Sequence, residues 1–499
     1  MSDQTRPLLL GSRAAGISER ALRRRLEAAT LQISVDPDLP GAWLTLGVLA
    51  TTARRLPIRL ALDAEGLPKE WVGDLRSRVE RVDSSRGLIL DPEPAQGVRL
   101  HIGTRAVSEN VIRIVPDGYG AHVARDGHAV IEPARLAHPL GSVFAAAIGM
   151  GEAFKDLAGV LAARRVDHGH LTWCPVALSQ DLTLAPMQAE TLHLQLALAG
   201  CGAIGTAIAV ILQELDAEGE VLVIDRQRFG TENLATYSLG DEGSKSGRPW
   251  KVTLVRRHLH RYKVQRYRGD VADLPRLVDE GRLEWPRVIL AGLDTPEARR
   301  ELQRLWPDRL IDGGTSDTAV GLHDVMAEDG PCIACFFPER KSKVLEQLAD
   351  LTGLSLERLG QDDVIVPEDL EGKRAQQRAV LEPQVGGRVC GLAQAVGLVV
   401  DGEGGYQPAV TFVAQQAACH VVGRLIADEV GFESSGNFVE YDTLIGPRED
   451  CLDRRRANPA CYCQSRGEMI RRVRAVRGAR RLSHLGPAAG YGWPPEVRQ

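Results

Sequence analysis

LQLALAGCGAIGT, residues 194–206, is an apolar run that leads directly into three closely spaced glycines. A strand that turns into a helix through glycines lets the backbone approach a phosphate at the helix N-terminus. A second apolar run, EVLVI at 220–224, ends in Asp225, where an acid can bind a ribose hydroxyl. Together the two stretches predict a βαβ nucleotide-binding unit, a pattern that a dinucleotide dehydrogenase would also show.

The chain around this motif alternates short apolar runs with helical patterns. Such alternation predicts a mostly parallel sheet covered on both faces. A polar, charged segment at about 339–400 predicts a helical insertion or crossover, and 408–430 is a long apolar helix that returns to the sheet. The strands are expected at 194–199, 220–224, 287–291 and 309–312.

Residues 1–185 have an α/β pattern of their own but lack a glycine-rich loop, so this domain is not expected to hold a nucleotide by itself. Its 140–162 helix has the same small-residue character as the 408–430 helix, which indicates an internal duplication. The expected domains are 1–185, 186–470 and a basic tail at 471–499. Within the first domain we expect helices at 17–33, 42–55 and 140–162 and strands at 58–62, 98–102 and 111–115.

Composition bounds the class of protein. The 499 residues carry a net charge of −5, with 44% hydrophobic and 25% charged residues, as in ordinary globular proteins. The chain lacks the overall positive charge that would favour binding to nucleic acid. The arginines at 471–481 are interpreted as a solvated helix face or a disordered end. No run approaches the ~20 apolar residues of a membrane helix, and the first residues do not resemble a signal peptide. We therefore expect a cytoplasmic protein without nucleic-acid or membrane partners.

Three polar residues follow the predicted strands or open a helix. Asp294 ends the run VILAGLD at 288–294, just after the 287–291 strand, where it could hold Mg²⁺ against phosphates or cap the next helix. Lys251 opens a helix from which it could reach phosphate, with Lys245 and Arg248 as rivals and a surface lysine as the alternative. Asn233 could bind ribose or phosphate, or simply shape a turn.

Two cysteine pairs have spacings that suit a metal. Cys332 and Cys335 form a CxxC, and Cys461 and Cys463 form a CxC. Four thiolates bind Zn²⁺ in structural sites, so we expect one structural zinc, with Cys451 as a possible substitute for one ligand. Four unrelated buried thiols are the alternative.

The ordered set of motifs resembles the ubiquitin-activating enzyme superfamily, including its ThiF/MoeB branch. The resemblance covers about 190–465 and implies a Rossmann-like, ThiF/MoeB-type adenylation fold that uses ATP, Mg²⁺ and Zn²⁺. In that family the enzyme adenylates the C-terminal carboxylate of a ubiquitin-like protein and usually captures it as a thioester. The nucleotide-binding positions that it implies are Gly200, Gly202, Ala203, Ile204, Gly205, Asp225, Asn233, Lys251 and Asp294.

Cys390 stands where this family places its thioester-forming nucleophile. Flanking glycines leave room for an acyl-adenylate, and nearby Arg388 would favour the thiolate. The alternative is a small buried core residue. The resemblance therefore implies Cys390, Asp294 and Lys251 as the catalytic residues.

Two positions depart from the family pattern. Gln227 replaces an acid two residues after Asp225, and Thr236 replaces an arginine three residues after Asn233. That arginine normally contacts phosphate, so a different cation is expected to compensate. The candidates are Arg248, Arg299, Arg300, and the helix with Arg20, Arg23, Arg24 and Arg25.

The sequence therefore predicts an activating enzyme for a ubiquitin-like protein, with an inactive adenylation-like half and an active half. Such two-half enzymes occur in bacterial ubiquitin-like conjugation, which is thought to serve antiviral defence. A ubiquitin-conjugating-like enzyme is an expected partner, and a homodimer is possible. A sulfur-carrier adenylyltransferase of thiamine or molybdopterin type, an NAD(P)-dependent oxidoreductase and a non-catalytic scaffold remain as alternatives.

Overall fold

The computed structural model describes residues 5–92, 97–105, 107, 110–125, 131–326, 330–338, 343–359, 364–387, 389, 392 and 410–484. The chain forms two compact units, one of residues 1–336 and 408–499 and the other of residues 337–407. Two sheets lie in the larger unit, and the glycine motif belongs to the second of them.

The second sheet has the strand order β10-β9-β8-β11-β12-β13-β14-β15. Its strands are parallel from β10 to β12, and β13 to β15 continue the sheet antiparallel. This confirms the α/β, Rossmann-like fold class. The strands are β8 Leu192–Ala199, β9 Ala217–Ile224, β10 Tyr262–Tyr267, β11 Val288–Ala291, β12 Arg309–Ser316, β13 Ala319–Met326, β14 Phe438–Asp442 and β15 Leu452–Asp453. The helices that follow or flank them are α6 Ala203–Glu214, α7 Glu242–Gly247, α8 Lys251–His258, α9 Leu274–Asp279, α10 Pro296–Gln303, α11 Ile333–Phe336 and α16 Thr411–Glu429.

The first sheet repeats this plan, in the order β3-β2-β1-β4-β5-β6-β7. Its strands are parallel from β3 to β5 and antiparallel at β6 and β7. The same strand order and directions in both sheets are what an internal duplication would produce. That this half is an inactive adenylation domain stays a prediction. The elements are α1 Thr5–Ala15, α2 Glu19–Ala28, β1 Thr30–Val35, α3 Ala42–Ala53, β2 Arg59–Leu62, α4 Lys69–Val82, β3 Ile89–Leu90, β4 Val98–Ile102, β5 Val111–Asp117, β6 Gly120–Ala124, α5 Pro139–Ala158 and β7 His170–Trp173.

The prediction of a single helix over 17–33 is wrong for its last residues, which are not helical. Helix α2 is capped by Ser18 and ends at Ala28, and Ala29 is already extended. The residues TLQISV that follow form β1, which pairs in parallel with β2 on one side and β4 on the other. Its β-branched residues suit a central strand, so the end of the apparent helix is in fact the centre of the first sheet.

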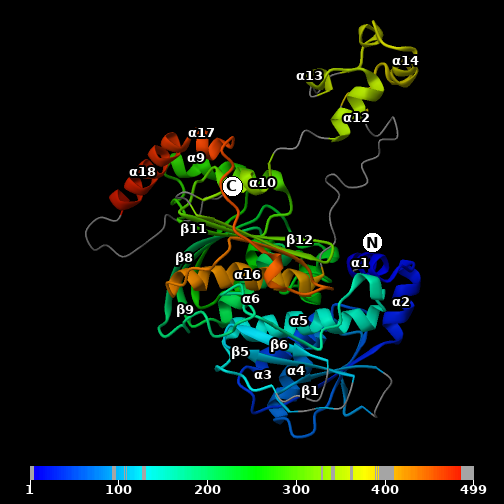
Figure 1. The fold of residues 1–499 in the computed structure, drawn as a ribbon, viewed down its shortest axis with the longest axis vertical. Coiled ribbons are helices and arrows are strands. Elements are labelled where there is room, and N and C mark those ends of the chain that lie inside the picture. The colour runs from blue at the N-terminus through cyan, green and yellow to red at the C-terminus, as the bar shows by residue number, and fades with distance from the viewer. Residues whose placement is uncertain are drawn as a thin grey trace. The chain divides into compact units, whose positions relative to one another are not determined.

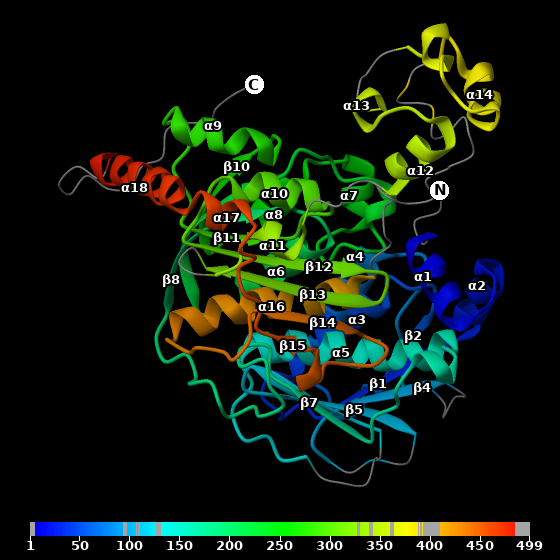
Figure 2. The same ribbon diagram turned by 45° about the horizontal axis from the view of Figure 1, so that its top comes forward.

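Helices α5 and α16 lie between the two sheets (Figures 1 and 2). Helix α5 packs on β5 and β6, α16 packs on β12 and β13, and the two helices pack on each other. Nearly all their side chains are buried, as expected for helices that are apolar on every side. One apolar core therefore runs through both sheets of the larger unit.

The arginine-rich end is a packed helix up to His484. Helix α17 spans Tyr462–Ser465 and α18 spans Gly467–His484. Arg477 is buried and donates to both carboxylate oxygens of Asp279, at 2.9 and 3.0 Å, and to the backbone oxygen of Leu305. Arg474 contacts Asp308 at 2.7 Å. The expectation of a solvated or disordered arginine run is therefore wrong for these two arginines, whereas residues 485–499 lie outside the described range.

The smaller unit contains the polar segment and is helical in the described residues. Its helices are α12 Lys343–Thr352, α13 Leu356–Leu359 and α14 Ala375–Leu381. A small apolar core holds them together, formed by Leu348, Leu354, Leu359, Ile365, Leu381, Val389 and Leu392.

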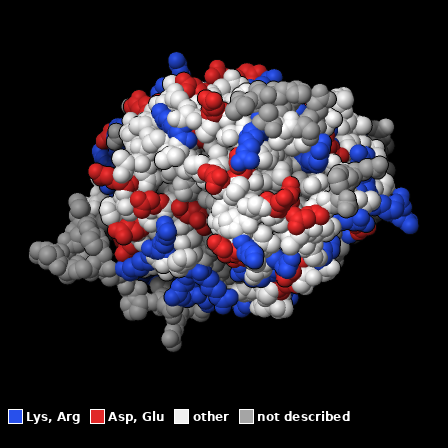
Figure 3. All heavy atoms as spheres, turned by 90° about the horizontal axis from the view of Figure 1, so that it is seen from below, with Lys and Arg blue, Asp and Glu red and all other residues white. Residues whose placement is uncertain are grey.

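Charged side chains of both signs occur across the face of the molecule seen in Figure 3. Such mixing agrees with the small net charge of −5. Among the described residues, no helix is both long and apolar enough to span a membrane.

Candidate functional site

The glycine motif lies where the strand order of the second sheet reverses. In the sheet, Ala199 of β8 pairs with Ile224 of β9 on one side and with Ala291 of β11 on the other. The residues that follow these strands, including Gly200 and Asp225, therefore reach the carboxyl edge of the sheet at the same level. Ligands of open α/β sheets bind in the crevice at this point.

Two glycines make the close turn from β8 into α6 possible. Gly200 has a φ of +86°, a left-handed conformation that favours glycine. A Cβ at Gly205 would lie 1.8 Å from the backbone oxygen of Gly200, so no other residue fits there. Helix α6 consequently begins directly above the strand end, with its first N–H groups at the edge where a phosphate would bind.

Asp225 lies beside the loop. Its carboxylate accepts hydrogen bonds from the backbone N–H of Cys201 at 2.8 Å and from that of Gln227 at 2.7 Å. Burial raises the pKa of Asp225, the ammonium of Lys251 opposes this rise, and the carboxylate of Asp294 adds to it. The structure thus brings Asp225, Lys251 and Asp294, which are far apart in the sequence, within electrostatic reach of one another.

Lys251 is a buried residue at the first position of α8, which excludes the alternative of a surface lysine. Its ammonium donates to the side-chain oxygen of Gln227 at 2.5 Å and to the hydroxyl of Tyr237 at 2.6 Å. Tyr237 could not be singled out from the sequence, because no motif spacing links it to a lysine on a different element.

Asp294 is exposed at the carboxyl end of β11. Thr295, not Asp294, caps the following helix, because its hydroxyl oxygen accepts from the backbone N–H of Ala298 at 3.2 Å. Helix capping therefore does not account for Asp294, and its binding of Mg²⁺ stays a prediction.

Asn233 and Thr236 shape the turn that follows Asp225. The side-chain oxygen of Asn233 accepts from the backbone N–H of Gly230 at 2.8 Å, and Asn233 is buried. Thr236 is fully buried and donates its hydroxyl to the backbone oxygen of Asn233 at 3.3 Å. These contacts match the turn-forming alternative for Asn233, whereas its contact with a nucleotide stays a prediction.

An arginine of the first half supports the same turn. Arg55, just after α3, donates to the backbone oxygens of Leu234, Ser238 and Gly240 at 2.5, 2.9 and 2.9 Å. Burial lowers the pKa of Arg55 to about 10, so its guanidinium still carries its charge at neutral pH. Arg299, an expected cation, instead donates to the backbone oxygen of Leu293 and lies 3.3 Å from the buried Asp312.

Arg55→Met should destabilise the protein because three buried carbonyl groups lose their charged donor. We expect the free energy of unfolding to fall by about 2–3 kcal/mol in urea denaturation. The control is Arg78→Met, which removes an exposed ion pair with Asp74 and should cost less than about 1 kcal/mol. An equal decrease in the free energy of unfolding of the two variants would contradict this role of Arg55.

The four cysteines of the two pairs come together. Their sulfur atoms all lie within 4.8 Å of one another, with 3.6 Å between Cys332 and Cys461 and 3.6 Å between Cys335 and Cys463. Tetrahedral Zn–S bonds of about 2.3 Å place thiolates about 3.8 Å apart, so the arrangement fits one zinc ion. Cys451 is not part of this group and contacts Asp450 instead.

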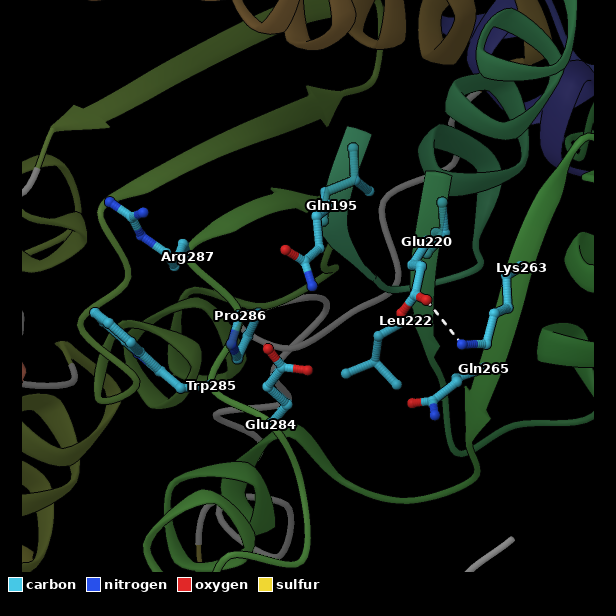
Figure 4. A pocket seen from close by; sticks show the side chains of 11 residues that line it. Gln195, Glu220, Leu222, Lys263, Gln265, Glu284, Trp285, Pro286 and Arg287 are labelled. Atoms are coloured by element: carbon cyan, nitrogen blue, oxygen red, sulfur yellow. Dashed lines mark hydrogen bonds and ion pairs between the residues drawn. The ribbon is translucent and has the colours of Figure 1, made fainter. Parts of the chain in front are cut away.

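A hollow on the second sheet is not the nucleotide site. Figure 4 shows it between Gln195, the ion pair of Glu220 with Lys263, and the segment Glu284–Arg287. Its volume of about 20 Å³ holds little more than one water molecule. Gln195 and Glu220 pair in the middle of their strands, well before the carboxyl edge.

The proposed nucleophile, Cys390, lies outside the described residues, so the structure gives it no geometry. The loop, Asp225, Lys251 and Asp294 are thus the predicted site residues that the structure brings to one edge.

Comparison with protein families agrees with this geometry. The model described as the ThiF family matches residues 178–463, more than half of the chain. The chain belongs to the ThiF family. The match includes the glycine loop, Asp294 and all four clustered cysteines, and it begins just before β8. Membership of the ThiF family confirms the recognised resemblance.

Solved structures similar to this ThiF-family chain include Escherichia coli MccB, at 14% identity, a TM-score of 0.34 and coverage of 54% of this chain and 64% of that chain. E. coli MccB with ATP is 13% identical, with a TM-score of 0.35 and coverage of 54% and 65%. The chain thus matches less than two thirds of the length of these structures. No curated protein matches it.

Proposed function

We propose that this protein uses ATP to adenylate the C-terminal carboxylate of a ubiquitin-like protein. The observation that carries the proposal is the convergence of Asp225, Lys251 and Asp294 on the glycine loop at the reversal point of the sheet. Membership of the ThiF family supports adenylation of a carboxylate. The ubiquitin-like substrate comes from the resemblance of the ordered motifs.

Each residue has a task in this reaction. The N-terminus of α6 would face the phosphates, and Asp225 would bind the ribose. Asp294 would hold Mg²⁺, which neutralises phosphate charge when it is bound. Lys251 offsets the negative charge that builds up as the partner's carboxylate oxygen attacks the α-phosphorus. The bond from that phosphorus to the bridging oxygen breaks, and pyrophosphate leaves with the electron pair.

A thioester step follows on Cys390. Its thiolate attacks the acyl carbon of the adenylate, the carbon–oxygen bond to phosphate breaks, and AMP leaves. A ubiquitin-conjugating-like enzyme would take the acyl group next. We set the reaction in a bacterial ubiquitin-like conjugation pathway that serves antiviral defence.

Zinc would have a structural task. Cys332, Cys335, Cys461 and Cys463 would hold it, joining the chain just before the smaller unit to the start of α17. A site with four thiolate ligands leaves no open position for catalysis.

Cys390→Ala should separate the two chemical steps. With a candidate ubiquitin-like protein as the substrate, ATP–pyrophosphate exchange should persist, whereas the thiol-sensitive protein adduct should disappear. Cys451→Ala, which removes a partly exposed thiol outside the cysteine cluster, should keep both.

Other outcomes would point to the alternatives. An adduct that persists in Cys390→Ala assigns the nucleophile to another cysteine. Turnover of NADH without any exchange contradicts adenylation and favours an oxidoreductase. Formation of a thiocarboxylate on the partner favours a sulfur-carrier pathway.

A further inference from the structure

The ammonium of Lys251 donates hydrogen bonds to two uncharged oxygens. Gln227 and Tyr237 accept its hydrogen bonds at 2.5 and 2.6 Å. Gln227 stands where the resemblance leads one to expect a carboxylate. A carboxylate at that distance would cancel much of the charge of the lysine, whereas an amide or hydroxyl oxygen orients the ammonium and leaves its charge intact.

The two departures from the family pattern balance each other in charge. Gln227 removes one negative charge from the site, and Thr236 removes one positive charge. Thr236 lies fully buried with its hydroxyl directed to a backbone oxygen, so it contributes nothing to the phosphates. The two departures therefore leave the summed charge of these two positions as in the family pattern, and Lys251 is a cation within electrostatic reach of Asp225.

Tyr237 lies between the lysine and the phosphate loop. A Cβ at Gly202 would lie 3.6 Å from its hydroxyl, which places that hydroxyl beside the loop. The ring packs edge-on against Phe229, with centroids 5.8 Å apart, in a small apolar cluster with Leu234 and Leu254. This packing holds the hydroxyl in place, because a buried ring in such a cluster has little rotational freedom.

We infer that Tyr237 is a positioning residue that, with Gln227, orients the ammonium of Lys251 toward the triphosphate. Arg55 supports the arrangement from the first half, because it binds the backbone oxygens of Leu234 and Ser238 on either side of Tyr237. The inference rests on the proposed function, because it assigns two residues that orient Lys251 toward the phosphates of ATP in that site.

The test compares Tyr237→Phe and Gln227→Glu with Tyr262→Phe. The control removes a hydroxyl of similar burial, which donates to the backbone oxygen of Leu212 at 2.8 Å at the far end of β10. Calorimetry measures the Kd of MgATP and of adenosine, and pyrophosphate exchange gives kcat and KM. We expect each site variant to raise the Kd of MgATP at least ~10-fold and the Kd of adenosine less than ~3-fold, since only the phosphates would contact the lysine.

The outcomes are distinguishable. A wild-type protein that neither binds MgATP nor exchanges pyrophosphate overturns the proposed function itself. An active wild type with both site variants equal to Tyr262→Phe overturns the inference alone, and equal weakening of MgATP and adenosine shows a merely structural effect. If Tyr237→Phe fails to fold, Gln227→Glu decides, because residue 227 is exposed and tolerates a carboxylate.

Discussion

Asp294→Asn should reduce pyrophosphate exchange by about 10²–10³-fold while leaving the melting temperature unchanged. Asparagine keeps the size of the side chain but removes the negative charge that would hold Mg²⁺. The helix α10 should be unaffected, because Thr295 supplies its cap. Pyrophosphate exchange measured over a range of Mg²⁺ concentrations checks the loss of activity. Thermal unfolding of the same sample checks that the melting temperature is unchanged.

Asp317→Asn is the matched control for Asp294. It changes a partly exposed aspartate at the turn between β12 and β13, which forms a surface ion pair with Arg13 at 3.3 Å and has a φ of +51° that is compatible with asparagine. Exchange should stay within about twofold of wild type, as for ordinary surface substitutions. If Asp294→Asn keeps full exchange, the proposed metal ligand is wrong. A large drop in its melting temperature would show a structural task instead.

Cys461→Ser should release zinc and destabilise the protein. Wild-type protein purified without chelators is expected to contain one zinc per chain, and the variant should contain much less. Removing one ligand of a structural metal should cost about 3 kcal/mol or more and lower the melting temperature by roughly 3 °C or more. Metal analysis and thermal unfolding measure the two effects.

Cys451→Ser controls for the loss of a thiol as such, because Cys451 lies outside the group of four. Its zinc content should equal that of wild type. Wild-type protein without zinc would contradict the site. Zinc retained in Cys461→Ser would mean that another residue completes the coordination.

The sequence predicted the parts of the fold that have a local signal. The glycines at 200–205 predicted the turn into α6, because backbone conformation and close approach demand them. Strand β1 was missed, since its first residues continue the apolar spacing of α2. The antiparallel strands β13 to β15 lack such a signal, because their place depends on partners distant in the chain.

The site was predictable to the same extent. Asp225 and Asp294 follow strands, and strand ends can be read from apolar runs. Arg55 and Tyr237 could not be found in this way, because each acts through contacts with a different element. The one available signal was the arginine pair that closes the apolar α3 segment, since a charge beside a buried helix needs a partner.

The duplicated sheets belong to one polypeptide and share one core. Enzymes that build a site from two separate subunits lose it upon dilution, as mass action drives them apart. Here the guanidinium of Arg55 in one half binds the turn at 234–240 in the other, and one continuous backbone joins the two halves. That support is therefore retained at any cellular abundance, however scarce the protein becomes.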